Sequence, residues 1–329
     1  MILKHFNPMQ DWAIGVDLGA TKIEVALINF QGFIKDRLRI PTEIHEGYNS
    51  VINRIASSID KLRGQNPGIA SSAIGVGVAG QVEKNTGLVS YAPNLEWHRV
   101  NIQEALSEKV NIPIVVCNDV RAATWGEWLY GAGKGCNHLV CVFVGTGIGG
   151  GIVSSGQMLE GFNNTAGEIG HITLDINGAQ CHCGNRGCFE ALASGWAIER
   201  DARMAVKEDR NAGKKLLEIS GGETVNITAK AVADAALQSD PISKLLINNI
   251  TTALIAGSIS IVNTLGPHRL IFGGGVIEGI PGLIGKIEKG VKKYALGTAA
   301  SRLEVLPASL HEDSVVVGAA VFALKKFKI

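Results

Sequence analysis

The sequence has almost no excess of charge of either sign. Its 31 lysines and arginines stand against 30 aspartates and glutamates in 329 residues, so the formal net charge is +1. A protein that binds nucleic acid by neutralising phosphates over a wide face needs a basic excess, and this balance argues against that class. The opening residues MILKHFNPMQDWAIGVD contain no long apolar core followed by a small-residue cleavage site, which argues against a secretory signal. Apolar runs such as residues 315–324 are shorter than the about 20 residues that cross a bilayer. We therefore expect a soluble, cytoplasmic protein with neither a membrane nor a nucleic acid as partner.

The sequence also lacks a low-complexity linker, although its length favours two domains at roughly 100–200 residues per domain. We expect a small α/β domain from residues 1–118 together with about 308–329. Residues 119–307 are expected to form a large α/β domain. The absence of a linker predicts that the two domains share a hinge.

Glycine, by contrast, is abundant, with 41 residues. It clusters at residues 17–22 (DLGATK), 75–80 (GVGVAG), 145–151 (GTGIGGG) and 272–275 (FGGG). Such clusters usually mark tight turns or a close approach of the backbone to a ligand. Several of them follow β-like runs, which predicts a cleft that binds phosphate. Ordinary loops would explain one or two of these clusters but hardly four.

Two stretches repeat the pattern strand, glycine turn, strand. Residues 12–17 precede the first turn, and Ile23, Val25 and Leu27 alternate after it. Residues 138–144 and 151–153 flank the second turn. This similarity predicts two related α/β halves. We also expect strands at 73–78, 112–117 and 270–272, and helices at 51–62, 122–130, 228–237, 241–265 and 314–326.

The second glycine turn matches G-x-G-x-x-G, the fingerprint of dinucleotide-binding enzymes. That fingerprint should open a helix, whereas the following residues GIVSSG predict a strand, so we reject a dehydrogenase. The sequence also has no G-x-x-x-x-G-K-[ST] motif, which excludes a P-loop enzyme. Backbone N–H groups at Gly145, Thr146 and Gly147 can still bind phosphate oxygens.

The first glycine turn combines groups that suit Mg²⁺-phosphate. Asp17 can attract the hydrated metal, Thr21 and the turn N–H groups around Gly19 can bind phosphate oxygens, and Lys22 supplies a cation. Phosphoryl transfer also needs a carboxylate that accepts the proton of the attacking hydroxyl. Asp119, at an expected strand end beside Asn118, is our candidate. Its other interpretation is a helix N-cap for residues 122–130, and both roles could hold together.

Cys181, Cys183 and Cys188 lie within eight residues among glycines, so their sulfur atoms can turn towards one point. His171 would complete the tetrahedral set that structural zinc prefers, whereas His182 would have to fold back. Free thiols or a disulfide are the alternatives, and the absence of an export signal disfavours the disulfide. The remaining cysteines, Cys117, Cys136 and Cys141, are expected to be buried.

Taken together, these residues resemble the ROK family (repressors, open reading frames and sugar kinases) almost from end to end. Residues 17–22 resemble its first phosphate loop, residues 145–151 its second, and Gly273, Gly274 and Gly275 its adenosine loop. Glu168-x-Gly-His171 and Cys181-x-Cys183-Gly-x-x-Gly-Cys188-x-Glu190 resemble its zinc and sugar signature. Ala20 stands where the family usually has a glycine, and Val120 where it often has alanine.

The resemblance implies the actin-like ATPase fold, an α/β architecture of duplicated RNase H-like halves with a cleft between two domains. It implies a kinase that uses ATP with Mg²⁺ and a structural Zn²⁺ to phosphorylate a hexose, with Asp119 as general base. Substrate-binding residues would be Asn94, Asn118, Asp119, Glu168, His171 and Glu190. The resemblance further suggests a homodimer.

The identity of the sugar stays open between glucose, at its 6-hydroxyl, and N-acetylmannosamine or N-acetylglucosamine. Asn163-Asn164 or the segment 96–98 could tune acceptance of a 2-acetamido group. The rival class is a ROK sugar sensor that represses transcription. Such proteins carry a helix-turn-helix domain ahead of the first hairpin, and only about eleven residues precede Trp12 here.

Overall fold

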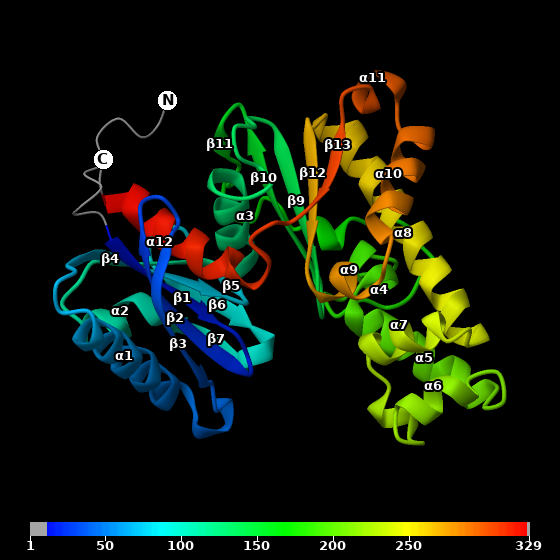
Figure 1. Ribbon diagram of the computed structural model, residues 1–329, viewed down its shortest axis with the longest axis horizontal. Coiled ribbons are helices and arrows are strands. Elements are labelled where there is room, and N and C mark those ends of the chain that lie inside the picture. Colours follow the sequence, from blue (N-terminus) through cyan, green and yellow to red (C-terminus); the bar gives the residue numbers. More distant parts are fainter. Residues whose placement is uncertain (1–11, 328–329) are drawn as a thin grey trace. The chain divides into compact units, whose positions relative to one another are not determined.

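The computed structural model describes residues 12–327, and contacts between Cα atoms divide them into two compact units (Figure 1). The first unit contains the described residues up to Gly135, then Met158–Ala166, and the chain from Ser309 onwards. The second unit contains Cys136–Gln157 and Gly167–Ala308. The signal-peptide prediction and the outer ends of the expected small domain, residues 1–11 and 328–329, lie outside the described residues.

The first unit extends beyond the expected boundary at residue 118. It includes helix α3 (Asp119–Leu129) because that helix packs against α12 (Ser314–Phe327) at very close range. A Cβ on Gly318 of α12 would overlap the carbonyl oxygen of Ala122 in α3. The segment 158–166 also belongs to this unit, which the sequence did not indicate.

Two sheets and four helices form most of the first unit. The larger sheet has the order β3-β2-β1-β4-β8, in which β1, β4 and β8 are parallel, and β2 is antiparallel to both of its neighbours, β1 and β3. Its strands are β1 (Trp12–Leu18), β2 (Lys22–Asn29), β3 (Ile34–Pro41), β4 (Ser71–Val78) and β8 (Ile114–Asn118). The smaller sheet contains β5 (Gln81–Val82), β6 (Leu88–Ala92) and β7 (Trp97–Asn101). The other two helices are α1 (Tyr48–Gln65) and α2 (Ile102–Ser107).

The two faces of the larger sheet carry side chains of different size. One face presents large residues such as Ile14, Val16 and Ile74, which form a core with helix α1. The opposite face presents many alanines and glycines to α12 and α3, with Ile28 and Val115 as larger exceptions. A Cβ on Gly15 or Gly75 would overlap a carbonyl oxygen of α12, so these glycines let helix backbone rest on strand backbone. The glycine cluster at 75–80 therefore serves packing within and after β4, and its expected part in a cleft that binds phosphate stays a prediction.

The second unit repeats the topology of the larger sheet. Its order is β11-β10-β9-β12-β13, with an antiparallel β9–β10 hairpin beside parallel β12 and β13. The strands are β9 (Leu139–Val144), β10 (Ile148–Ser154), β11 (Gln157–Met158), β12 (Arg269–Gly273) and β13 (Glu304–Pro307). The matching strand orders of the two sheets agree with the predicted duplication of an α/β half.

Helices surround the second sheet and share one large apolar core with it. They are α4 (Phe189–Ala193), α5 (Gly195–Glu208), α6 (Lys214–Ile219), α7 (Ala229–Leu237), α8 (Pro241–Leu265), α9 (Gly275–Gly279), α10 (Leu283–Tyr294) and α11 (Gly297–Ala300). Within the described residues, α8 alone is long and apolar enough to pass as a membrane span, but half of its most apolar window is buried. Its side chains belong to the core of this unit, as the sequence predicted.

The contact between β4 and α12 gives a direct test of the packing. Gly75→Ala should lower the free energy of unfolding by about 1–3 kcal/mol, because the new methyl group overlaps the backbone of Ala319. Gly64→Ala is the matched control, since nothing lies near its Cβ position in helix α1, and it should stabilise by up to about 1 kcal/mol. Urea unfolding monitored by circular dichroism measures both; equal stability of the two variants would contradict the packing.

Candidate functional site

Polar side chains gather at the carboxyl ends of the parallel strands of the first unit. Asp17 lies near the end of β1, and the turn that follows carries Gly19, Thr21 and Lys22 into β2. Thr42, which is buried just after β3, holds this turn in place, because its hydroxyl donates to the carbonyl of Gly19 at 2.7 Å. The carboxyl end of a parallel strand is where ligands bind in open α/β sheets.

Asn118 and Asp119 follow directly from the neighbouring β8. The Asn118 side chain caps helix α3 by accepting a hydrogen bond from the Arg121 N–H at 3.0 Å. The N-cap role that the sequence allowed for Asp119 therefore belongs to Asn118, and α3 begins at Asp119. The Asp119 Oδ1 atom accepts hydrogen bonds from the Val120 N–H at 2.9 Å and from the Asn118 amide at 3.0 Å. These bonds fix the orientation of the carboxylate.

The electrostatics of this edge centre on Asp17. The pKa of Asp17 is raised to about 7, first by burial and second by the negative charge of Asp119. Lys22 opposes this rise, and Glu24 adds to it. At neutral pH, therefore, Asp17 is balanced between its neutral and its charged form, and a cation bound nearby would favour the charged form.

Lys22 lies within a network of ion pairs that the sequence did not reveal. The buried carboxylate of Glu24 accepts from Arg37 at 3.0 Å and from Arg39 at 2.7 Å, and the Lys22 ammonium lies 3.9 Å from it. Arg37 also binds Asp313, just ahead of α12. Glu24 pairs with Asp17 across the β1–β2 hairpin, which explains its effect on the pKa of Asp17.

Of the predicted sugar-binding residues in the first unit, Asn94 lies on a different segment from Asn118 and Asp119. It lies exposed in a short 3₁₀ turn (Pro93–Leu95) between β6 and β7, and no hydrogen bond ties it to Asn118 or Asp119. The two segments are nevertheless neighbours through Gly80: its carbonyl accepts from the Asn118 amide, and a Cβ on it would meet Ala92.

Asn164 has a structural role, and the tuning role considered from the sequence stays a prediction. Its side chain accepts a hydrogen bond from Arg121 and donates to the carbonyl of Val82 at 2.9 Å. Arg121 also donates to the carbonyl of Ala166 at 3.3 Å. Arg121 thereby holds the segment 158–166 within the first unit, a function for which the sequence offered no signal.

In the second unit, the two predicted glycine turns lie side by side. Gly145, Thr146 and Gly147 connect β9 to β10. This loop is shorter than the predicted one at 145–151, because β10 already begins at Ile148. Gly273 ends β12, while Gly274 has a φ of 95° and precedes α9. A Cβ on Gly274 would meet the carbonyl oxygen of Val144 at the end of β9, so only glycine allows this approach.

Glu190 is held against the turn at 145–147. Its Oε2 atom accepts a hydrogen bond from the Ile148 N–H at 2.8 Å, and its Oε1 atom accepts from the indole N–H of Trp196 at 3.4 Å. A Cβ on Gly147 would collide with this carboxylate. Glu168 precedes a 3₁₀ turn (Ile169–His171) that ends at His171. This turn packs on strand β10, since a Cβ on Gly170 would overlap the carbonyl of Ile148.

The donor atoms of His171, Cys181, Cys183 and Cys188 all lie within 4.8 Å of one another. The Nδ1 atom of His171 is 3.8 Å from the sulfur of Cys181, and the sulfurs of Cys183 and Cys188 are 3.7 Å apart. None of the six cysteines forms a disulfide, which removes that alternative, and Cys117, Cys136 and Cys141 are buried as expected. His182 is not part of the cluster; its ring stacks on Trp196.

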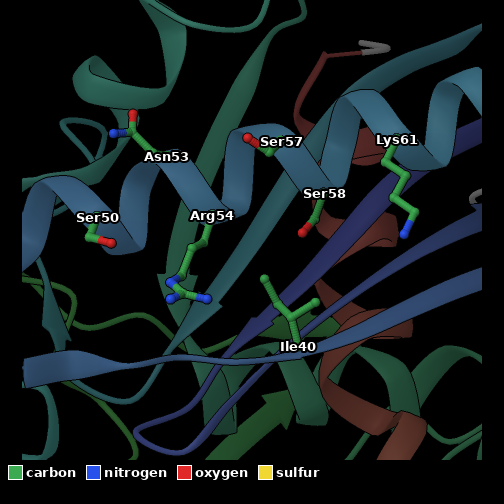
Figure 2. A pocket seen from close by; sticks show the side chains of 7 residues that line it. All are labelled: Ile40, Ser50, Asn53, Arg54, Ser57, Ser58 and Lys61. Carbon is green, nitrogen blue, oxygen red and sulfur yellow. The ribbon is translucent and has the colours of Figure 1, made fainter. Parts of the chain in front are cut away.

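A shallow polar pocket of about 380 Å³ lies between helix α1 and strand β3. Figure 2 shows Arg54 and Ser58 pointing from the helix towards the strand that carries Ile40. The Arg54 guanidinium is already paired with Glu46 at 2.9 Å. None of the lining residues belongs to the predicted site, so this pocket does not bear on the candidate chemistry.

The pKa of Asp17 predicts a pH dependence of stability. A carboxyl with a pKa of about 7 in the folded chain and 3.8 as its ordinary value binds its proton more tightly when folded. Its contribution to stability is therefore full below pH 4 and is lost as the pH rises towards 7. Asp17→Asn should remove this loss, so the free energy of unfolding should fall less between pH 5 and 8 in the variant than in the unsubstituted protein. Denaturant unfolding at several pH values measures it; parallel profiles would contradict the assignment.

The comparisons with known proteins agree with this geometry. Residues 13–326 match the family model described as ROK family. A protein named glucokinase from Halalkalibacterium halodurans is 35% identical over 310 residues, covering 93% of each chain. A xylose repressor from Bacillus spizizenii is 27% identical over 333 residues, covering 99% of this chain and 80% of that protein.

Among solved structures, the ROK family glucokinase from Streptomyces griseus, described in complex with glucose and AMPPNP, has a TM-score of 0.82 and 31% identity. The likeness covers 95% of this chain and 99% of that one. The fold of this chain is accordingly the α/β actin-like ATPase fold with two domains. The family match over nearly the whole chain, and the identity to the glucokinase relative, lead to one conclusion: this chain belongs to the ROK family.

Proposed function

We propose that this chain is an ATP-dependent hexose kinase that transfers the γ-phosphoryl group of ATP to the 6-hydroxyl of glucose. The observation that carries the proposal is the fixed carboxylate of Asp119 at the end of β8, beside Asp17 at the end of β1. Relatives named glucokinase, similar to this chain over almost its whole length, support the choice of sugar.

Asp119 acts as the general base in this proposal. Phosphoryl transfer is catalysed mainly by positioning and by electrostatic stabilisation, and the protein must also accept the proton of the attacking hydroxyl. The hydrogen bonds from Val120 and Asn118 to Oδ1 restrict rotation of the Asp119 side chain. A base held in one orientation loses little entropy when the sugar hydroxyl arrives.

The nucleotide is bound by backbone and by charge in this proposal. Gly19, Thr21 and Lys22 of the first turn and Gly145, Thr146 and Gly147 of the second face the phosphates, and Gly273, Gly274 and Gly275 approach the adenosine. Asp17 fits a partner of Mg²⁺, because its carboxyl is buried beside the negative charge of Asp119, and Lys22 offsets only part of the resulting rise in its pKa. When bound, Mg²⁺ would supply that charge and neutralise the phosphate oxygens.

Asn94, Asn118, Asp119, Glu168, His171 and Glu190 are proposed to bind the sugar. Carboxylate, amide and imidazole groups match the donors and acceptors of sugar hydroxyls. Such a site discriminates well, because a substrate that lacks one hydroxyl leaves a polar group of the protein unpaired.

His171, Cys181, Cys183 and Cys188 are proposed to hold a structural zinc ion. Three sulfur atoms and one ring nitrogen within 4.8 Å of one another form the donor set that zinc prefers. The metal would fix the segment from His171 to Cys188, which leads directly into Glu190 in α4, and so would orient two of the sugar-binding side chains.

The base assignment predicts the behaviour of Asp119→Asn. Turnover should fall by about 10²–10⁴-fold, because the variant cannot accept the proton, while binding of AMPPNP should survive. Asp60→Asn on helix α1 is the matched control and should keep its turnover, since its carboxylate is exposed. Near-normal kcat in Asp119→Asn would remove this residue from the proposed role.

A coupled ADP-release assay with glucose, mannose, fructose, N-acetylglucosamine and N-acetylmannosamine provides the rate measurement for these variants. It also separates the proposed kinase from the alternatives. Glucose should give the highest kcat/KM, whereas a preference for a 2-acetamido sugar would favour an N-acylhexosamine kinase. A sugar-binding regulator, the second candidate suggested by the xylose repressor relative, would release no ADP with any of them.

Metal analysis tests the zinc proposal. Freshly purified protein should contain about one zinc per chain, since three thiolates and a histidine bind it tightly. Cys183→Ser should lose the metal, and its exposed position makes other structural damage small. Cys136→Ser, outside the cluster, is the control and should retain zinc. Protein without stoichiometric zinc at purification would contradict the assignment.

The cytoplasmic location and the homodimer stay predictions.

A further inference from the structure

The second unit contains a chain of contacts that runs from the cysteine loop to the second glycine turn. Its central residue is Trp196, at the start of helix α5, which no part of the sequence analysis singled out. The proposed function assigns the cysteine loop to zinc and sugar and the turn to nucleotide phosphates. A connection between them would therefore link the two substrates.

The first step connects the cysteine loop to Trp196. The ring of His182, which lies between two of the clustered cysteines, stacks on the indole with 4.2 Å between ring centroids. The indole also packs against the buried side chains of Cys181, Cys188 and Ala191. The Arg200 guanidinium lies over the same ring, 4.9 Å from its centroid. These contacts restrict the orientation of the indole.

The second step connects Trp196 to the turn, both directly and through Glu190. The backbone N–H groups of Gly195 and Trp196 donate to the carbonyls of Gly145 at 2.8 Å and Thr146 at 3.1 Å. The indole N–H donates to Glu190, whose other oxygen accepts from the Ile148 N–H immediately after the turn. The turn is thus held on one side by the start of α5 and on the other by a carboxylate that the indole orients.

We propose that Trp196 is a positioning residue that, through Glu190, couples sugar binding to nucleotide binding. The inference rests on the proposed function and deepens it. A carboxylate has about four lone-pair directions, so Glu190 can bind sugar hydroxyls without releasing the Ile148 N–H. Sugar bound to Glu190 then favours the same carboxylate position that holds the phosphate turn. Two ligands that favour one arrangement bind with positive, reciprocal coupling.

Trp196→Phe is the variant that tests the coupling. It removes the indole N–H but keeps an aromatic ring against the cysteine loop and leaves both backbone hydrogen bonds in place. The dissociation constant of AMPPNP is measured by titration calorimetry with and without saturating glucose. In the unsubstituted protein, glucose should tighten AMPPNP by a factor within the typical range of about 5–150. In Trp196→Phe this factor should approach one, the AMPPNP affinity measured alone should fall several-fold, and the zinc content should be unchanged.

Two further variants separate positioning from a general structural role. His182→Ala removes the stacking but keeps the indole N–H, and it should retain the coupling factor, because Cys181, Cys188 and Arg200 still hold the ring. Glu190→Gln should weaken AMPPNP in the absence of sugar, although Glu190 has no proposed contact with the nucleotide, because an amide cannot accept at both positions. An unchanged coupling factor in Trp196→Phe would overturn the inference, as would unchanged AMPPNP affinity in Glu190→Gln. Failure of the unsubstituted protein to bind glucose would instead count against the proposed function, and the AMPPNP affinities alone would still decide the role of Trp196.

Discussion

The candidate chemistry of the first unit depends on how closely helix backbone approaches the central strands. At Gly15 and Gly75 the sheet has no side chain under α12, so the helix lies on the strands themselves. Gly77, which pairs with Asp17 across β1 and β4, continues this row under the start of α3. A Cβ at Gly77 would lie 3.5 Å from the Cα of Asp119. The start of α3 therefore lies against β4 beside Asp17, and burial first and the negative charge of Asp119 second raise the pKa of Asp17.

The second unit has the same strand order but supplies different chemistry at the matching turn. The turn after β1 is bordered by the carboxylate of Asp17 and the ammonium of Lys22, whereas the turn at 145–147 contains two glycines and a threonine. A charged group reaches the second turn from elsewhere in the unit, as the carboxylate of Glu190. In the proposed kinase, the first unit would therefore supply charge and the base, and the second would supply backbone donors held in place by the cysteine loop.

Local patterns in the sequence were sufficient for much of the fold. The β1–β2 hairpin and the helix α8 were predicted correctly because alternation and helical periodicity are properties of neighbouring residues. The same reasoning did not reveal that the glycines of β4 pack against helices, since a glycine needed for helix packing looks like a glycine needed for a turn. Strands β3, β6 and β7 were missed, because their polar and half-buried residues do not form the buried apolar runs that marked β8 and β12.

The candidate site also contains residues that the sequence revealed and residues that it did not, and the difference has a physical cause. The Cys/His cluster was visible in the sequence because three of its ligands lie within eight residues, and chain geometry alone brings their sulfurs together. The contact between Glu190 and Ile148 joins residues 42 positions apart, and no local pattern encodes it. Trp196 is harder still to recognise, because its significance lies in an indole N–H directed at a carboxylate rather than in its residue type. Residues that ligate a substrate or a metal can thus be recognised by their chemistry, whereas residues that position them become visible only when the fold shows which backbone they hold.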